Sequence, residues 1–222
     1  GRGWRAKGYR GPLAIIPQFG VDPEVMRPAT GAERQRSAGR GFIVGYVGRL
    51  VEEKGVDLLL EALAGLEGTW RAYILGSGPE REALQARSRR LGLSHRISFD
   101  EWIPSSHTPG YYRQLDVLVL PSRTRSNWKE QFGRVLVEAM ACGVPVIGSD
   151  SGEIPNVIGE AGLIFPEGDA NALQQHLAQL LRDQDLKASL AEKGRKRVLA
   201  QYTQAKVAAQ THRVYQQILA AE

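Results

Sequence analysis

The sequence predicts an α/β fold, an open parallel sheet with helices on both faces. Three observations lead to this prediction. Continuous apolar runs at 42–47 and 117–120 suit strands that are buried on both faces, as in parallel sheets. Turns rich in glycine or proline follow such runs, and apolar residues at helical spacing come next. The 222 residues, 42% hydrophobic and 24% charged, provide ordinary globular material for one large domain or two small ones.

The first half of the chain alternates apolar runs with helical spacing. Residues 13–17 form a short apolar run and are expected as a strand, whereas 27–41 are polar and typical of a loop. After the 42–47 strand, a helix is indicated by the spacing of Leu58, Leu59, Ala62 and Leu63. The next expected elements are a strand at 70–75, a helix at 80–91, a strand at 96–99, a short helix at 111–115 and a strand at 116–122.

The stretch 130–147 organises the rest of the chain. An apolar helical face is indicated by the spacing of Val135, Leu136, Ala139 and Met140. Gly143 then stands where a helix ends on a left-handed residue, and 144–147 resumes as a buried strand. The pattern therefore predicts a loop, a helix, a glycine stop and a strand.

Two carboxylates frame this helix. Glu130 lies just before it and Glu138 lies on it, so both can face a cleft beside the helix start. That start offers unpaired N–H groups from about Phe132 to Arg134, which suit an anion. Carboxylates accept hydrogen bonds from paired hydroxyls, and N–H groups bind phosphate or sugar oxygens. A nucleotide-sugar carries both kinds of group. The alternative is an ordinary helix whose glutamates are solvated.

The last third is mainly helical. A tight turn and short helix are expected at 148–155, a strand at 162–165, and an N-cap at Asp169. The remaining helices are expected from there to about 183, at 187–200 and at 204–220.

With its intervening residues, the 130–146 stretch resembles the E-x7-E motif of retaining glycosyltransferases of family 4, which have the GT-B fold. The resemblance covers the two glutamates, Phe132-Gly133, Glu138-Ala139-Met140-Ala141 and Gly143-Val144-Pro145-Val146. It implies a Rossmann-like domain, the C-terminal half of a GT-B fold. Two further stretches resemble the family: 48–55, as G-R-L-x-x-x-K-G, and 17–22, as I-P-N-G-V-D with Gln18-Phe19 in place of the asparagine.

The resemblance implies a role for each matched residue. Arg49 and Lys54 would stabilise the diphosphate, Glu130 would contact sugar hydroxyls, and these three would take part in the transfer step. Glu138 would accept from the ribose hydroxyls. The base slot falls on Trp102-Ile103, where Trp102 either stacks on the base or, as we favour, packs in the core. The complete donor-binding set is Gly48, Arg49, Lys54, Trp102, Ile103, Glu130, Gln131, Phe132, Gly133, Arg134 and Glu138.

The family comparison also implies a domain layout. Residues 1–16 would be an interdomain connection, 17–203 the nucleotide-sugar-binding domain, and 204–222 a helix that packs on an N-terminal acceptor domain. That helix should then show an apolar stripe without a partner. The implied function is the donor half of an enzyme that moves a hexosyl group from an NDP-sugar to a saccharide or lipid acceptor, inactive in transfer on its own. An NDP-sugar epimerase of GT-B architecture and a non-catalytic nucleotide-sugar module remain alternatives.

The composition indicates which kinds of partner and cofactor to expect. The net charge of +5 is spread out and no basic stripe carries interleaved aromatics, so we expect no nucleic acid. The four histidines are scattered and Cys142 is the single cysteine, so we expect no metal and no cofactor besides the donor substrate. No apolar run reaches 18 residues. We expect a cytoplasmic protein, with peripheral contact at the inner face of a membrane left open. The long 123–129 loop either tunes substrate choice or is a variable surface loop.

Overall fold

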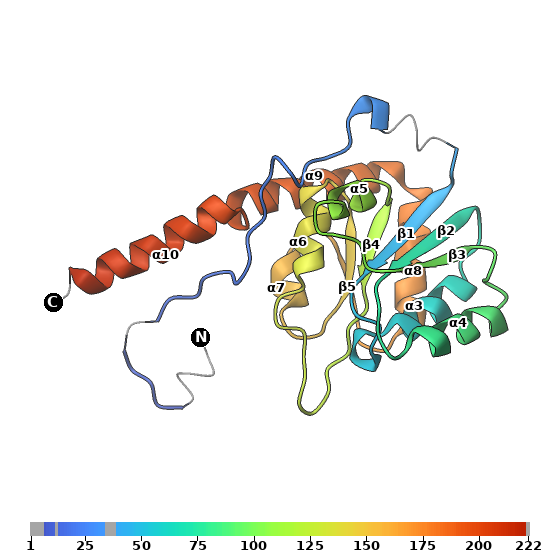
Figure 1. The fold of residues 1–222 in the computed structure, drawn as a ribbon, viewed down its shortest axis with the longest axis horizontal. Helices are drawn as coiled ribbons and strands as arrows, with labels where there is room; N and C mark the ends of the chain where they lie inside the picture. Colours follow the sequence, from blue (N-terminus) through green and yellow to red (C-terminus); the bar gives the residue numbers. More distant parts are fainter. Residues whose placement is uncertain (1–6, 12, 34–38, 221–222) are drawn as a thin grey trace.

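A parallel sheet forms the centre of the molecule in the computed structural model, which describes residues 7–11, 13–33 and 39–220. Within those residues the sheet has six strands in the order β3-β2-β1-β4-β5-β6, and all of its pairings are parallel (Figure 1). The strands are β1 (Phe42–Val47), β2 (Trp70–Leu75), β3 (Ile97–Asp100), β4 (Val117–Leu120), β5 (Val146–Ser149) and β6 (Leu163–Phe165). The predicted open parallel sheet is confirmed.

Helices cover both faces of the sheet, which explains why β1 and β4 are apolar throughout and fully buried. One face packs against α3 (Val56–Ala64), α4 (Arg81–Arg90) and α8 (Ala170–Arg182). The other packs against α5 (Thr108–Tyr112), α6 (Arg134–Ala141) and α7 (Ile154–Ile158). Helix α9 (Gln184–Gln201) contributes Leu190 to the first apolar cluster and Val198 to the second. The predicted N-cap is confirmed, because the Asp169 carboxylate accepts from the Ala172 N–H at 2.9 Å.

The order of the strands reverses between β1 and β4. Strand β1 pairs with β2 on one side and β4 on the other, so the connections leave these two strands in opposite directions. In open α/β sheets, ligands bind at the carboxyl ends of the strands beside such a switch point. The 48–55 segment with its short helix η1 (Glu52–Lys54) follows β1, and the 121–130 segment follows β4. Two of the three matched stretches, 48–55 and 130–146, therefore begin at this edge.

The predicted strand at 13–17 is wrong. Residues 13–17 have no regular secondary structure, and Ile15 is 77% exposed. The backbone pairs a few residues later, where Val21 forms an isolated parallel bridge with Thr203. An apolar run alone does not make a strand, because strand hydrogen bonds need a neighbouring edge. The predicted bounds of β1 and β2 are confirmed, and the ends of the other four strands differ from the predicted bounds by at most two residues.

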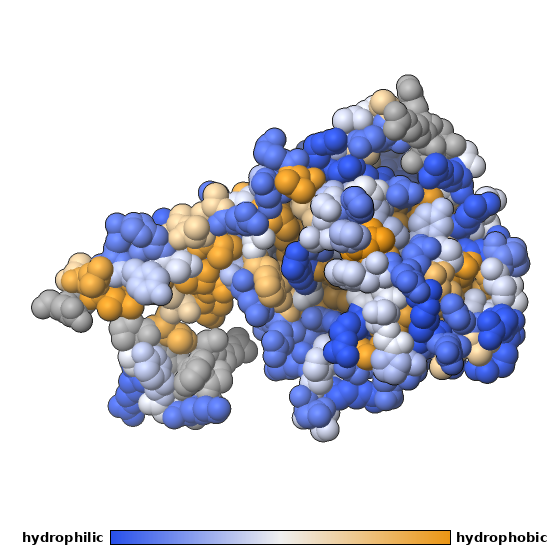
Figure 2. Space-filling view, in the orientation of Figure 1, coloured by the Kyte–Doolittle hydropathy of each residue, from blue (hydrophilic) through white to orange (hydrophobic). Residues whose placement is uncertain are grey.

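Helix α10 (Gln204–Leu219) extends away from the sheet (Figure 1). Thr203 caps it, and none of its residues, all of them described, is buried. Tyr215, Ile218 and Leu219 are between 51% and 71% exposed, and Figure 2 shows hydrophobic residues gathered along this helix. The expected apolar stripe is therefore present. No helix in the described part of the chain combines the length and hydropathy needed to cross a bilayer.

Candidate functional site

Glu130 lies at the carboxyl edge of the sheet, in the loop between β4 and α6, and is only 8% exposed. Its Oε2 accepts from the Lys54 ammonium at 2.6 Å and from the Ser122 hydroxyl at 3.0 Å. Lys54 comes from η1 after β1, and Ser122 is the second residue after β4. The switch point therefore brings these three groups together.

The backbone of Glu130 is fixed from the other side. Its carbonyl accepts from the Glu153 N–H at 2.9 Å. Gly152 lies so close that a Cβ there would stand 2.0 Å from the Glu130 carbonyl oxygen, and its φ of 56° is left-handed. Only glycine fits such a position. The turn after β5 thus holds the first glutamate in place.

Glu138 lies on α6, one to two turns from the helix start, and is 7% exposed. Its Oε1 accepts from the Arg134 Nε at 2.6 Å, and its Oε2 accepts from the Tyr112 hydroxyl at 2.7 Å. Burial, and secondly the Glu138 charge, raise the pKa of Tyr112 well above its usual value. The hydroxyl therefore remains protonated and donates. The alternative of solvated glutamates is wrong for both positions.

The turn after β1 brings Gly48 and Arg49 to the same edge. The Gly48 N–H donates to the Leu75 carbonyl at 3.0 Å, and the Tyr46 hydroxyl donates to the Arg49 carbonyl at 2.7 Å. A Cβ on Gly76 would stand 1.8 Å from the Gly48 carbonyl oxygen, so the turns after β1 and β2 touch. The Arg49 side chain is exposed. A fixed backbone thus carries an exposed cation at the carboxyl edge of the sheet.

The start of α6 is shaped by Gly133, which is the N-cap with φ 75°. The first helical hydrogen bond runs from the Leu136 N–H to the Gly133 carbonyl at 2.9 Å, so the N–H groups before it precede the helical ladder. Gln131 and Arg134 are exposed. The Phe132 side chain, in contrast, is buried.

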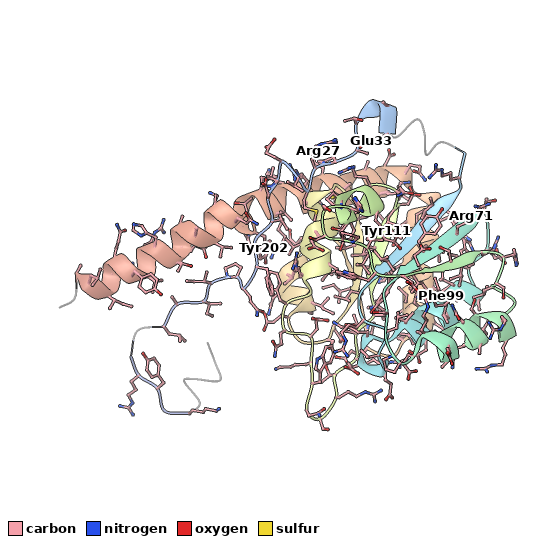
Figure 3. The ribbon with its side chains drawn as sticks, in the orientation of Figure 1. Arg27, Glu33, Arg71, Phe99, Tyr111 and Tyr202 are labelled. Atoms are coloured by element: carbon pink, nitrogen blue, oxygen red, sulfur yellow. The ribbon has the colours of Figure 1, made fainter. Side chains whose placement is uncertain are left out.

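Phe132 is an anchor, since it is only 9% exposed and its ring lies 5.8 Å from the rings of both Phe19 and Tyr202. Tyr202 lies where α9 gives way to α10, beside the N-terminal segment (Figure 3). The aromatic cluster therefore ties the loop before α6 to residues far apart in the sequence. The Phe132 ring therefore serves packing, and a donor-binding role for this residue stays a prediction.

The expected core packing of Trp102 is wrong, because its side chain is 61% exposed. It follows β3, the edge strand of the sheet, and no further strand in the described part of the chain covers that side. Ile103 is half-buried against the apolar cluster on the α6 face. The remaining alternative, an aromatic ring available to stack on a base, stays a prediction.

The 123–129 loop is held by several contacts. Arg123 pairs with Asp57 at 3.0 Å, Arg125 pairs with Glu52, and Thr124 donates through its N–H and its hydroxyl to Glu167. The Lys54 ammonium lies 5.0 Å from the centre of the Trp128 ring. The basic residues at 123 and 125 are thus engaged with neighbouring acids, and the loop places one aromatic ring against the Lys54–Glu130 pair.

A cavity of about 1050 Å³ opens elsewhere, at the amino ends of β1 and β4. Its lining includes Arg113, Asp116, Lys187 and Arg195. Lys187 is paired with Asp116 at 2.6 Å, and Arg195 donates to the carbonyls of Pro23, Met26 and Ala141. These cations serve the packing of α9, and the cavity lies at the opposite end of the strands from the two glutamates.

The described residues contain no group of three or more His, Cys, Asp or Glu that could hold a metal ion. The absence of a metal in the reaction stays a prediction. The site chemistry that the residues do supply is a buried carboxylate pair, a half-buried ammonium, an exposed guanidinium and a helix start, which together suit hydroxyls beside a phosphate.

Three residues of the site were not found from the sequence: Tyr46, Tyr112 and Ser122. Each supports a matched residue by a single hydroxyl hydrogen bond. A tyrosine within an apolar stretch is expected in the hydrophobic core, and both tyrosines are fully buried. Nothing in the sequence pattern indicates that their hydroxyls contact site residues. Only Ser122 carried a signal, because it stands at the carboxyl end of the predicted strand 116–122.

The fold and site define a Rossmann-like domain of the GT-B class of glycosyltransferases. The structure matches sucrose-phosphate synthase from Thermosynechococcus elongatus with a TM-score of 0.85 and 30% identity, over 100% of this chain and 57% of that one. It also matches the C-terminal domain of a group 1 glycosyl transferase from Francisella tularensis, with a TM-score of 0.73 and 28% identity, over 83% of this chain and 100% of that one.

The chain belongs to the family Glycosyl transferases group 1, which it matches over residues 31–197. Among curated relatives, the GDP-mannose-dependent alpha-(1-6)-phosphatidylinositol monomannoside mannosyltransferase of Mycolicibacterium smegmatis is 32% identical over 198 residues, covering 83% of this chain and 52% of that protein. The chain spans about half the length of the curated relatives it matches. The resemblance noted in the sequence is confirmed at the level of the family.

Proposed function

We propose that this chain is the donor-binding part of a retaining hexosyltransferase that uses an NDP-sugar and a saccharide or lipid acceptor. The observation that carries the proposal is the pair of buried carboxylates, Glu130 and Glu138, at the carboxyl edge where β1 and β4 diverge. A relative that is named for its use of GDP-mannose supports a nucleotide-sugar as the donor.

The diphosphate would lie between Arg49, Lys54 and the start of α6. An ammonium has three donors, and Glu130 takes one of those of Lys54, so two remain for phosphate oxygens. Its side chain is 20% exposed, which leaves a path to the ligand. The N–H groups at the start of α6 add a second positive end.

Glu138 would hold the ribose and Glu130 the sugar. In the transfer step, the bond between the anomeric carbon and the diphosphate oxygen breaks, and the oxygen keeps the electron pair. The acceptor oxygen then bonds the anomeric carbon, and its proton passes to the departing diphosphate. Arg49 and Lys54 stabilise the charge that develops on the diphosphate, and this stabilisation lowers the barrier. The proposal includes no metal, because two cations and a helix start supply the positive charge.

Calorimetry tests the proposal directly. We expect one equivalent of UDP, GDP, UDP-glucose or GDP-mannose to bind this chain in excess chelator, because the site supplies its own cations. Lys54→Ala should weaken binding, whereas Lys7→Ala, at an exposed lysine of the N-terminal segment, should leave it unchanged. Lack of binding by all four ligands would overturn the proposal, and binding only after magnesium or manganese is added would overturn its metal-independent part.

A further inference from the structure

The two oxygens of the Glu138 carboxylate face different surroundings. Oε1 accepts from Arg134, whose side chain is 56% exposed, so this oxygen faces the solvent side of α6. Oε2 accepts from the hydroxyl of Tyr112, which is 0% exposed, so this oxygen faces the core. A ligand can therefore approach the carboxylate from the side of Arg134 only.

The inner hydrogen bond limits how the carboxylate can turn. A glutamate on a helix has three rotatable side-chain bonds, and a buried carboxylate without an inner donor would be drawn toward the exposed Arg134, its other donor. The Tyr112 hydroxyl at 2.7 Å holds Oε2 in place. The ring of Tyr112 is fixed in turn by complete burial in the cluster beneath α5 and α6.

We propose that Tyr112 is a positioning residue for ribose recognition: its hydroxyl orients the Glu138 carboxylate so that the free lone pairs face the ribose hydroxyls. This inference rests on the proposed function and deepens it. Tyr112 does not touch the nucleotide, because it is fully buried. It sets the preference of the site for a ribonucleotide over a 2′-deoxynucleotide.

Tyr111 provides a matched control on the same helix. It is the adjacent residue, labelled in Figure 3, and is 9% exposed. Its hydroxyl is buried and has no hydrogen-bond partner among the described residues, whereas that of Tyr112 contacts Glu138. Tyr111→Phe and Tyr112→Phe therefore remove the same atom from neighbouring buried rings, and only the second removes a bond to Glu138.

The experiment measures the dissociation constants of UDP and GDP, and of their 2′-deoxy forms, by calorimetry. For whichever nucleotide the wild-type chain binds, the quantity compared is the ratio of affinities for the ribo and 2′-deoxy forms. We expect Tyr112→Phe to lower this ratio about 3- to 10-fold, as the loss of one oriented hydrogen bond would. Tyr111→Phe should leave the ratio unchanged. In a Glu138→Gln background, Tyr112→Phe should change it no further.

The outcomes distinguish a failure of the proposed function from a failure of the role inferred for Tyr112. If the wild-type chain binds neither nucleotide, or binds ribo and 2′-deoxy forms equally, the proposed function or its ribose contact fails, and the inference fails with it. If Glu138→Gln abolishes the preference and Tyr112→Phe behaves as Tyr111→Phe does, the proposed function stands and the inference is overturned. A melting curve of each variant shows whether it is folded.

Should Tyr112→Phe be unfolded, a crystal structure of the wild-type chain with bound nucleotide decides the question. We expect the Tyr112 hydroxyl to remain within hydrogen-bond distance of the Glu138 carboxylate while the ribose hydroxyls contact the same carboxylate. A complex in which ribose binds Glu138 and this inner bond is broken would overturn the inference.

Discussion

At the scale of single residues, the candidate site depends on buried charges with assigned partners. Glu138 is held by a cation at one oxygen and a hydroxyl at the other, whereas Lys54 and Ser122 both donate to the Oε2 of Glu130. Removing one partner of a buried charge leaves the other desolvated and uncompensated. Substitutions here therefore change binding and stability together, and each needs a control that separates the two.

The first residue-scale prediction concerns ribose. We expect Glu138→Gln to weaken binding of a ribonucleoside diphosphate by about 1.5–3 kcal/mol, roughly 10- to 150-fold, because a charge-assisted hydrogen bond is lost. Binding of the 2′-deoxy form should weaken much less. Calorimetry on both ligands measures this, with Glu67→Gln, an exposed glutamate after α3, as the control. An equal loss for both ligands would show that Glu138 does not hold the ribose.

The second concerns Cys142, which ends α6 and is 3% exposed. Burial raises the pKa of its thiol from 9.0 to about 12. The folded chain therefore keeps a proton that the unfolded chain loses above pH 9, so the thiol's contribution to stability is complete below pH 9 and declines as the pH rises toward 12. Between pH 8 and 10 we expect a loss of about 1 kcal/mol from this group.

Urea unfolding at pH 8 and pH 10 measures that loss, and Cys142→Ala is the reference because other groups titrate equally in both proteins. The free energy of unfolding should fall further with pH in the wild-type chain than in the variant. Identical slopes would contradict a buried, protonated thiol.

At the scale of elements, the site is assembled by contacts between loops. Gly55 ends η1 with φ 66°, and a Cβ there would stand 2.1 Å from the Pro121 carbonyl oxygen. The segment that carries Lys54 thus lies directly against the segment that carries Ser122 and Glu130. Close backbone approach is the physical reason for glycine at this position.

We expect Gly55→Ala to destabilise the chain more than Gly92→Ala does. Gly92 has a similar φ of 72° but open space around its Cβ position, so its substitution costs only the left-handed strain of about 1–2 kcal/mol. Gly55→Ala adds a clash that must separate the two loops, and it should also weaken nucleotide binding by moving Lys54. Urea unfolding and calorimetry on both variants measure these effects. Equal destabilisation, with unchanged binding, would contradict the loop contact.

The strands and most helices could be predicted because buried parallel strands are apolar throughout and helices show one apolar face, as in β1 and α6. Residues 13–17 were misjudged because an apolar run carries no information on whether a neighbouring strand exists. The exposure of Trp102 could not be predicted, because it depends on β3 being the edge strand of the sheet. The order of the strands is not encoded in the local sequence pattern. Tyr112 was missed because its contact with Glu138 joins positions 26 residues apart.

At the scale of the whole molecule, the sheet domain is well packed whereas α10 presents apolar residues to solvent. Tyr215, Ile218 and Leu219 are exposed on α10, and Leu13 and Ile15 are exposed on the N-terminal segment, which runs on the same side of the sheet as α10 (Figure 1). Exposed apolar groups of this kind mark an interaction surface. We propose that an acceptor domain covers this surface, as the interdomain layout expected from the family implies.

The last prediction follows from that layout: this 222-residue chain should bind the donor and transfer no sugar. The roles proposed for the site residues concern the nucleotide, the diphosphate and the donor sugar, and none of these roles involves holding an acceptor. Holding the acceptor oxygen close to the anomeric carbon accounts for much of the rate of such a reaction. If this chain holds the donor but not the acceptor, water and acceptor molecules both reach the anomeric carbon only by free diffusion. We therefore expect slow hydrolysis of the donor at most. Incubating the purified chain with UDP-glucose or GDP-mannose and a panel of saccharide and lipid acceptors, and following both products over time, tests this. Sustained multiple-turnover transfer by this chain alone would show that it carries an acceptor site of its own.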